Sequence, residues 1–195
     1  MRILVACEFS GIVRDAFLKK GHDVISCDLL PTENPGPHYQ GDIKDILYQE
    51  WDMIIAHPPC TRLANSGVRW LGERNLWRDL EEGCAFFKLF LDHPCEKIAI
   101  ENPLPHKYAW KKIGRKYDQL IQPWQFGHPE TKAICLWLKN LPKLRPINVV
   151  SGREQRVHFM SGKDRAKNRS RFFPGVAAVM ADTYGIIPYQ KGLLF

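Results

Sequence analysis

The chain has 195 residues, of which 45% are apolar and 25% charged, so its composition is that of one ordinary domain with a sound core. Its formal net charge of +7 favours a polyanionic partner; nucleic acid is the leading candidate, and a merely soluble basic surface is the alternative. No apolar run approaches the roughly 20 residues of a membrane span, and the first residues enter a strand directly, so we expect neither membrane segment nor signal peptide. Six cysteines are scattered without a Cys-x-x-Cys pair, which argues against a zinc site and for reduced thiols in the cytosol.

The start of the chain has the pattern of a βαβ unit. It consists of an apolar strand, an amphipathic helix and a second strand, at residues 2–7, 12–20 and 23–28. Ser10 is available to cap the helix, and Gly21 is a suitable residue to end it. Asp28 follows Gly11 by 17 residues and ends the second strand, where a carboxylate can accept ribose hydroxyls. We therefore expect a nucleoside cofactor, on a fingerprint that has only one glycine.

The stretch after this unit is irregular. Prolines and a glycine make residues 30–40 a loop without helix or strand, and a short helical segment is expected at residues 44–49. Asp42 stands just before that segment. It could cap the helix or receive the exocyclic amine of an adenine, and the residues leave both roles open.

Residues 53–60 carry the strongest chemical signal. The short apolar run 53–56 ends abruptly at two prolines and reads as a buried strand. Pro58 and Pro59 stiffen the loop that follows, and open α/β folds keep their chemistry at the carboxyl ends of strands. We interpret Cys60 as a presented nucleophile, with a small buried hydrophobic residue as the alternative.

The segment 61–74 is polar and basic, and we expect a mobile loop there. Its arginines, Arg62 and Arg69 among them, suit a phosphate backbone beside the candidate nucleophile, although a solvated loop would look the same. Residues 76–91 are the clearest helix of the chain, because their apolar side chains repeat at helical spacing.

A second reactive side chain ends the next strand. Residues 97–101 are apolar up to Glu101, which is followed by Asn102 and Pro103. Glu101 is thus expected at the same edge of the sheet as Cys60. A carboxyl group and a thiol at one edge form a general acid and nucleophile pair.

The C-terminal third is basic. Residues 133–138 return to strand, and residues 148–171 are expected to be a hairpin or an irregular insertion that faces DNA, with a disordered basic loop as the alternative. The cations of this segment that we expect at DNA are Arg153, Arg156, Arg165 and Arg169. Residues 174–184 close the chain as a helix that begins at Pro174.

In this order the motifs resemble those of the DNA cytosine-5-methyltransferases. The matching stretches are Phe9-Ser10-Gly11, Asp28, Gly41-Asp42-Ile43, Pro58-Pro59-Cys60 and Glu101-Asn102-Pro103. The resemblance covers residues 1 to about 138, with a weaker echo in the C-terminal helix. The chain departs from the family at Val13 and His57, where glycines are usual. It also lacks the Gln-x-Arg-x-Arg motif, in whose place Lys132 is the only comparable cation.

The resemblance implies an α/β, Rossmann-like fold with a mostly parallel sheet and helices on both faces. One catalytic domain would span residues 1–195, with the basic insertion 144–171 as a minimal target-recognition region. It further implies S-adenosylmethionine as cofactor, held by Phe9, Ser10, Gly11, Asp28, Asp42 and Pro58. The expected partner is DNA with a flipped cytosine, contacted also by Lys132, and a protein that supplies target recognition is a further candidate partner.

The implied reaction is methyl transfer to carbon 5 of cytosine. Cys60 would add to carbon 6 and make carbon 5 nucleophilic, while a protonated Glu101 would donate to ring nitrogen 3. Amino-methyltransferases carry an aromatic residue after Pro-Pro, so Cys60 sets that class aside. Three alternatives stay open: a catalytically silent binding protein, an enzyme acting on RNA or nucleotides, and transfer of another one-carbon group.

Overall fold

A computed structural model of the chain describes residues 1–186. Its core is one sheet of seven strands in the order β3-β2-β1-β4-β5-β7-β6. Their bounds are β1 Arg2–Ala6, β2 Asp23–Asp28, β3 His38–Gln40, β4 Met53–Ala56, β5 Lys97–Asn102, β6 Gln119–Ile121 and β7 Ile134–Lys139. The first five pair in parallel, and β7 runs antiparallel to both β5 and β6. This topology confirms the expected α/β class with a mostly parallel sheet.

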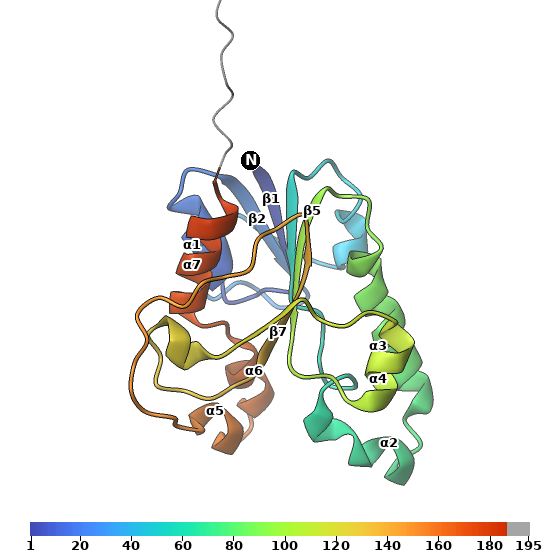
Figure 1. The fold of residues 1–195 in the computed structure, drawn as a ribbon. Helices are drawn as coiled ribbons and strands as arrows, with labels where there is room; N and C mark the ends of the chain where they lie inside the picture. The colour runs from blue at the N-terminus through green and yellow to red at the C-terminus, as the bar shows by residue number, and fades with distance from the viewer. Residues whose placement is uncertain (187–195) are drawn as a thin grey trace, which may run out of the picture.

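Helices cover both faces of the sheet (Figure 1). On one face lie α1, Ile12–Leu18, and α7, Pro174–Tyr184; on the other lie α3, Trp77–Leu91, and α4, Lys107–Ile113. Three short helices lie toward the carboxyl ends of the parallel strands: α2 Arg69–Glu73, α5 Arg156–Phe159 and α6 Arg165–Ser170. Single 3-10 turns occur at Ile43–Asp45, Asn65–Gly67 and Pro123–Phe126.

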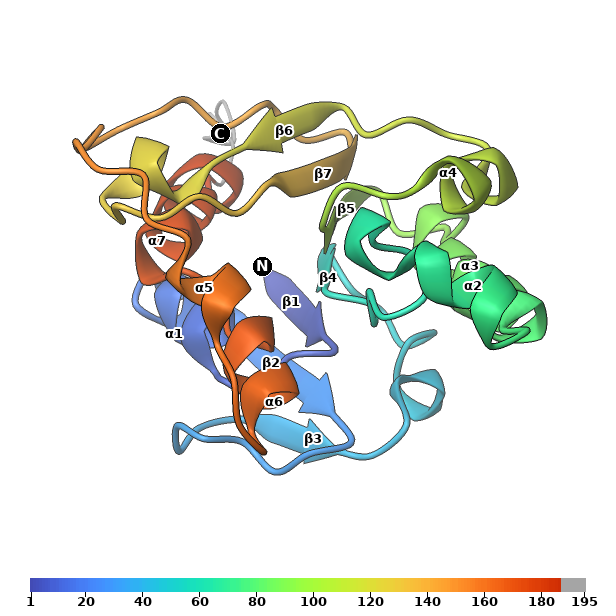
Figure 2. The ribbon, with the colours of Figure 1, turned by 90° about the horizontal axis from the view of Figure 1, so that it is seen from below.

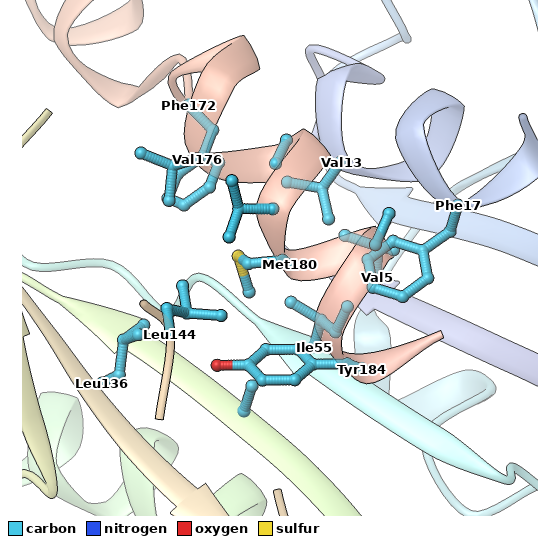
Figure 3. Packing of buried hydrophobic residues seen from close by; sticks show 14 of the residues in the cluster. Val5, Val13, Phe17, Ile55, Leu136, Leu144, Phe172, Val176, Met180 and Tyr184 are labelled. Carbon is cyan, nitrogen blue, oxygen red and sulfur yellow. The ribbon is translucent and has the colours of Figure 1, made fainter. Parts of the chain in front are cut away.

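The two faces bury separate apolar clusters. In β1, Val5 packs toward α1 and α7, while its neighbour Leu4 belongs to the cluster under α3. Figure 3 shows the first cluster, to which Phe17 of α1, Met180 of α7 and Val5 of β1 belong. Because the central strands are buried on both faces, their sequences are apolar throughout instead of alternating. Within residues 1–186, no helix is long and apolar enough to cross a membrane.

Four sequence-based expectations about local structure were wrong. The loop 30–40 contains β3, because its last residues pair with the free edge of β2. The helical segment 44–49 is only the 3-10 turn Ile43–Asp45. The expected mobile loop 61–74 contains α2, which the buried Leu71 anchors to the core. Of the two alternatives for residues 148–171 the hairpin is wrong, because the segment is an irregular insertion that carries the short helices α5 and α6.

Candidate active site

The loop between β1 and α1 is organised by a buried carboxylate. Glu8 Oε1 accepts hydrogen bonds from the Val13 backbone N–H at 2.8 Å and from Ser10 Oγ at 3.0 Å. The expected cap by Ser10 was wrong: Gly11 is the N-cap residue, in the left-handed region at φ 75°, and Ser10 Oγ accepts only a 3.3 Å bond from Ile12 N. Glu8 thus satisfies the helix N-terminus from within the protein. We had given Glu8 no role, although an acid just before a helix start is a recognisable signal.

A fully buried arginine joins α1 to the loop that follows β2. Arg14 donates from Nη2 to the Asn34 carbonyl at 2.8 Å, from Nη1 to Thr32 Oγ1 at 3.1 Å and from Nε to Asp15 Oδ1 at 2.8 Å. A Cβ atom at Gly11 would lie 2.5 Å from Nη2, so the guanidinium requires a glycine there. The two loops that could hold a cofactor are therefore fixed to each other by Arg14.

Further acidic groups stand at this edge. Asp28 ends β2 half-buried, and its Oδ1 accepts a 2.9 Å bond from the backbone N–H two residues on. Asp42 is exposed and caps the 3-10 turn by accepting from Lys44 N at 3.0 Å, so the capping role is observed. The Phe9 ring is buried, with Lys167 Nζ 5.4 Å from its centroid. Cofactor contacts by Phe9, Asp28 and Asp42 stay predictions.

The structure brings the loop of Cys60 and the end of β5 together. Because β4 pairs in parallel with β5, both chains leave the sheet at the same edge. Asn102 Nδ2 donates to the Pro58 carbonyl at 2.8 Å and fixes the two segments to each other. Burial raises the pKa of the half-buried Cys60 thiol, and the nearby charge of Glu101 raises it further, while Lys132 and Arg169 oppose the shift. Cys60 is thus a neutral thiol at neutral pH.

Glu101 is paired with a histidine. Its Oε2 lies 3.1 Å from His57 Nδ1, and the two side chains are only 11% and 10% exposed. Burial acts to raise the pKa of Glu101, but the hydrogen bond from His57 and the charge of Lys132 outweigh it, so the pKa is lowered. The carboxyl is ionised at neutral pH in this arrangement, whereas we expected it protonated.

Two predicted nucleic-acid residues lie at this site. Lys132 Nζ donates to the Arg169 carbonyl oxygen at 3.1 Å, and both cations act on the Cys60 thiol. Arg169 belongs to α6, which ion pairs hold against the loop after β2. In these pairs Arg171 donates to Glu33 through Nε and Nη2, both at 2.7 Å, and Lys167 Nζ lies 3.2 Å from the same carboxylate. The segment around α6 therefore spans from Phe9 to Cys60.

The other predicted cations are spread over both sides of the carboxyl edge. Helix α2, which carries Arg69, and helices α5 and α6 lie on opposite sides of the ends of β1 and β4 (Figure 2). Arg62 and Arg156 are engaged by carboxylates, of Asp79 at 3.0 Å and of Glu154 at 2.8 Å. Arg69 stacks on Trp70, Arg153 stacks on Trp124, and Arg165 is exposed on α6. Only Lys132 and Arg169 reach the candidate nucleophile.

Comparisons with known proteins give a distant likeness among solved structures. No protein-family model matches the chain, and no curated protein matches it. Among solved structures, the methyltransferase EhMeth of Entamoeba histolytica is similar at 15% sequence identity and a TM-score of 0.48. The match covers 83% of this chain and 60% of EhMeth, so the chain spans well under two thirds of that protein.

Proposed function

We propose that this protein transfers a methyl group from S-adenosylmethionine to carbon 5 of cytosine in DNA, through a covalent bond between Cys60 and carbon 6. The observation that carries the proposal is the meeting of a thiol and a buried carboxylate at the carboxyl ends of β4 and β5. The charge of Glu101 raises the pKa of the Cys60 thiol, and the bond from Asn102 to the Pro58 carbonyl holds the two segments together. Two cations, Lys132 and Arg169, face the same thiol and would attract a phosphate backbone.

The residues present fit the proposed methyl donor. The carboxyl ends of β2 and β3 carry the carboxylates of Asp28 and Asp42, which suit a sulfonium cation and ribose hydroxyls. A dinucleotide would bring a pyrophosphate to the N-terminus of α1, where Glu8 already occupies the Val13 N–H group. S-adenosylmethionine has no phosphate and meets no such conflict. When bound, it would supply the electrophilic methyl group.

The reaction needs a nucleophile and a proton carrier. Carbon 5 of cytosine is a weak nucleophile, and addition of the Cys60 sulfur to carbon 6 converts the ring to an enamine whose carbon 5 can attack. We propose that the ionised Glu101 accepts the Cys60 thiol proton and passes it to ring nitrogen 3, so the adduct carries no separated charge. After methyl transfer, loss of the carbon 5 proton to water breaks the sulfur–carbon bond, and the proton on ring nitrogen 3 returns through Glu101 to the sulfur of Cys60.

The substrate is proposed to be DNA with the target base turned out of the stack, since a stacked base cannot offer carbon 6 to a side chain. The segment 144–171, with α5 and α6, is the part of the chain that we propose to contact the target. It is short for a recognition element, and a partner protein that supplies further recognition would be consistent with it.

The test is transfer of labelled methyl from S-adenosylmethionine to mixed-sequence DNA. We expect label in 5-methylcytosine with the wild type, and none with Cys60→Ala. The matched control is Cys84→Ala, which removes a buried thiol of α3 and should leave transfer unchanged. Label in Cys60→Ala, or none with wild type that binds the donor, would contradict the proposed reaction. Failure to bind the donor would contradict the cofactor assignment as well.

The covalent step has its own assay. DNA that contains 5-fluorocytosine has no proton to lose at carbon 5, so the bond to Cys60 should persist after transfer. We expect a wild-type complex that survives denaturing electrophoresis and is missing with Cys60→Ala. Methyl transfer without any such complex would rule out the covalent route.

A further inference from the structure

His57 is a buried titratable residue to which the proposed reaction gives no task. It follows β4 directly, and its backbone N–H donates to the Ala6 carbonyl at 2.9 Å, which continues the sheet by one residue. Its side chain points at Glu101, with Nδ1 3.1 Å from Oε2. The backbone on both sides of the contact is thus part of the sheet or adjoins it, and the pair is held firmly.

The surroundings of the imidazole determine which proton it carries. The ring packs on Phe172 at 4.9 Å between centroids, and Nε2 has no hydrogen-bond partner among residues 1–186. A proton on Nδ1 satisfies Glu101, and Nε2 is left buried without a partner. The Nδ1–H group of His57 is therefore the donor to the Glu101 carboxylate.

We propose that His57 is the positioning residue of Glu101, and that it holds Oε2 so that Oε1 faces the target base. The inference rests on the proposed function for the identity of that base, but the contact between the two side chains does not. The pair also keeps Glu101 ionised, and hence able to accept the thiol proton of Cys60. The other charged group that acts on Glu101 is Lys132, Arg169 acts on the neighbouring Cys60, and Phe172 packs on the His57 ring.

Two substitutions of His57 separate the effect of its hydrogen bond to Glu101 from the effect of its side-chain volume. His57→Asn keeps an N–H donor at the atom that corresponds to Nδ1, because both nitrogens are bonded to Cγ. His57→Leu fills similar space without a donor. The matched control, His93→Leu, removes another buried imidazole, one that bonds to Cys95 N outside the site.

The first measurement is the titration of the Glu101 side-chain carboxyl by carbon-13 NMR, with the signal assigned by Glu101→Gln. In wild type, His57→Asn and His93→Leu we expect it to titrate below its ordinary value of 4.5, and in His57→Leu above that value. A Glu101 that titrates alike in His57→Leu and wild type would overturn the proposal. If His57→Leu does not fold, His57→Gln replaces it, since its longer side chain carries the amide beyond Oε2.

The second measurement is methyl transfer at varied pH. We expect kcat to fall about tenfold to a hundredfold in His57→Leu, with KM for the donor within about twofold, and to be largely retained in His57→Asn. An equal loss of kcat in His57→Leu and His57→Asn would show that the imidazole ring matters and its N–H donor does not, which would overturn the positioning role. If wild type transfers no methyl at all, the proposed function fails, while the NMR titration still decides whether His57 positions Glu101.

Discussion

Substitution of Arg14 tests whether the two candidate cofactor loops depend on one buried side chain. We expect Arg14→Met to lower the free energy of unfolding and to weaken binding of S-adenosylmethionine together, because Arg14 joins α1 to the loop after β2. Arg14→Lys keeps the charge but not the planar fork, and should recover only part of the loss.

The magnitude follows from the partners of the guanidinium. Arg14 Nη1 donates to Thr32 Oγ1 and to Ser26 Oγ, but both hydroxyl groups keep other hydrogen-bond partners when Arg14 is removed. The bonds from Arg14 to these two hydroxyls therefore add little to the stability. The 2.8 Å bonds to Asp15 Oδ1 and to the Asn34 carbonyl are charge-assisted, and each contributes about 1.5 kcal/mol. The expected loss is about 3 kcal/mol, which corresponds to a fall in Tm of roughly 6–12 °C in a domain of this size.

Urea unfolding followed by circular dichroism gives the stability, and isothermal titration gives the donor affinity of the folded variants. Lys20→Met is the control, because it removes a cation of comparable length whose ion pair with Asp182 is exposed. A loss below about 1 kcal/mol in Arg14→Met, or an unchanged donor affinity, would refute the idea that Arg14 holds these loops.

Two further predictions concern titrating groups. Iodoacetamide should alkylate Cys60 before the buried thiols of Cys27, Cys84, Cys95 and Cys135, and Glu101→Gln should speed the alkylation of Cys60 at pH 8, since it removes a charge that raises the thiol pKa. Mass spectrometry of tryptic peptides measures both effects. Slower alkylation of Cys60 in Glu101→Gln than in wild type would contradict a shared site. The hydrogen bonds from Arg171, opposed by burial and supported by Lys167, lower the pKa of Glu33 from 4.5 to about 2. Their contribution to the free energy of unfolding, about 1 kcal/mol, is therefore full above pH 4.5 and is lost as the pH falls toward 2. Hydrogen exchange at α6 should rise as the pH falls through that range in wild type, and it should already be raised at neutral pH in Arg171→Ala. Protection of α6 in wild type that does not depend on pH would contradict the idea that the ion pairs of Glu33 hold α6 in place.

The sheet could be predicted well because its central strands are buried on both faces. Short apolar runs bounded by turn residues gave β1, β2, β4 and β5 nearly to the residue, and the strand ends then placed Cys60 and Glu101 at one edge. The short strand β3 was missed because nothing in its three residues requires a strand. It exists because the edge of β2 offers unpaired backbone groups, which is a tertiary cause.

The support around the site was not predictable by the same reasoning. The sequence suggests His57 only as a neighbour of Cys60 or as a space filler in place of glycine, since its partner Glu101 lies 44 residues away. Glu33 lies 138 residues from Arg171, and neither residue stands in a motif. Such contacts depend on which loops the fold brings together, and periodicity and spacing carry no information about that. The reactive groups could thus be named from the sequence, but not what holds them.

The distribution of charge around the sheet edge bears on how two unlike reactants could meet there. One half, at the carboxyl ends of β2 and β3, presents Asp28 and Asp42, whereas in the other half Lys132 and Arg169 stand beside Cys60. A cationic methyl donor and an anionic nucleic acid would each be attracted to one half and repelled from the other, so neither would block the place of its partner. Glu101 lies where the halves meet, and His57 and Lys132 together keep it ionised there. Because the pKa of the Cys60 thiol is raised and that of Glu101 is lowered, transfer of the thiol proton to Glu101 is uphill, and the proposed path requires ring nitrogen 3 to take up the proton as the sulfur adds.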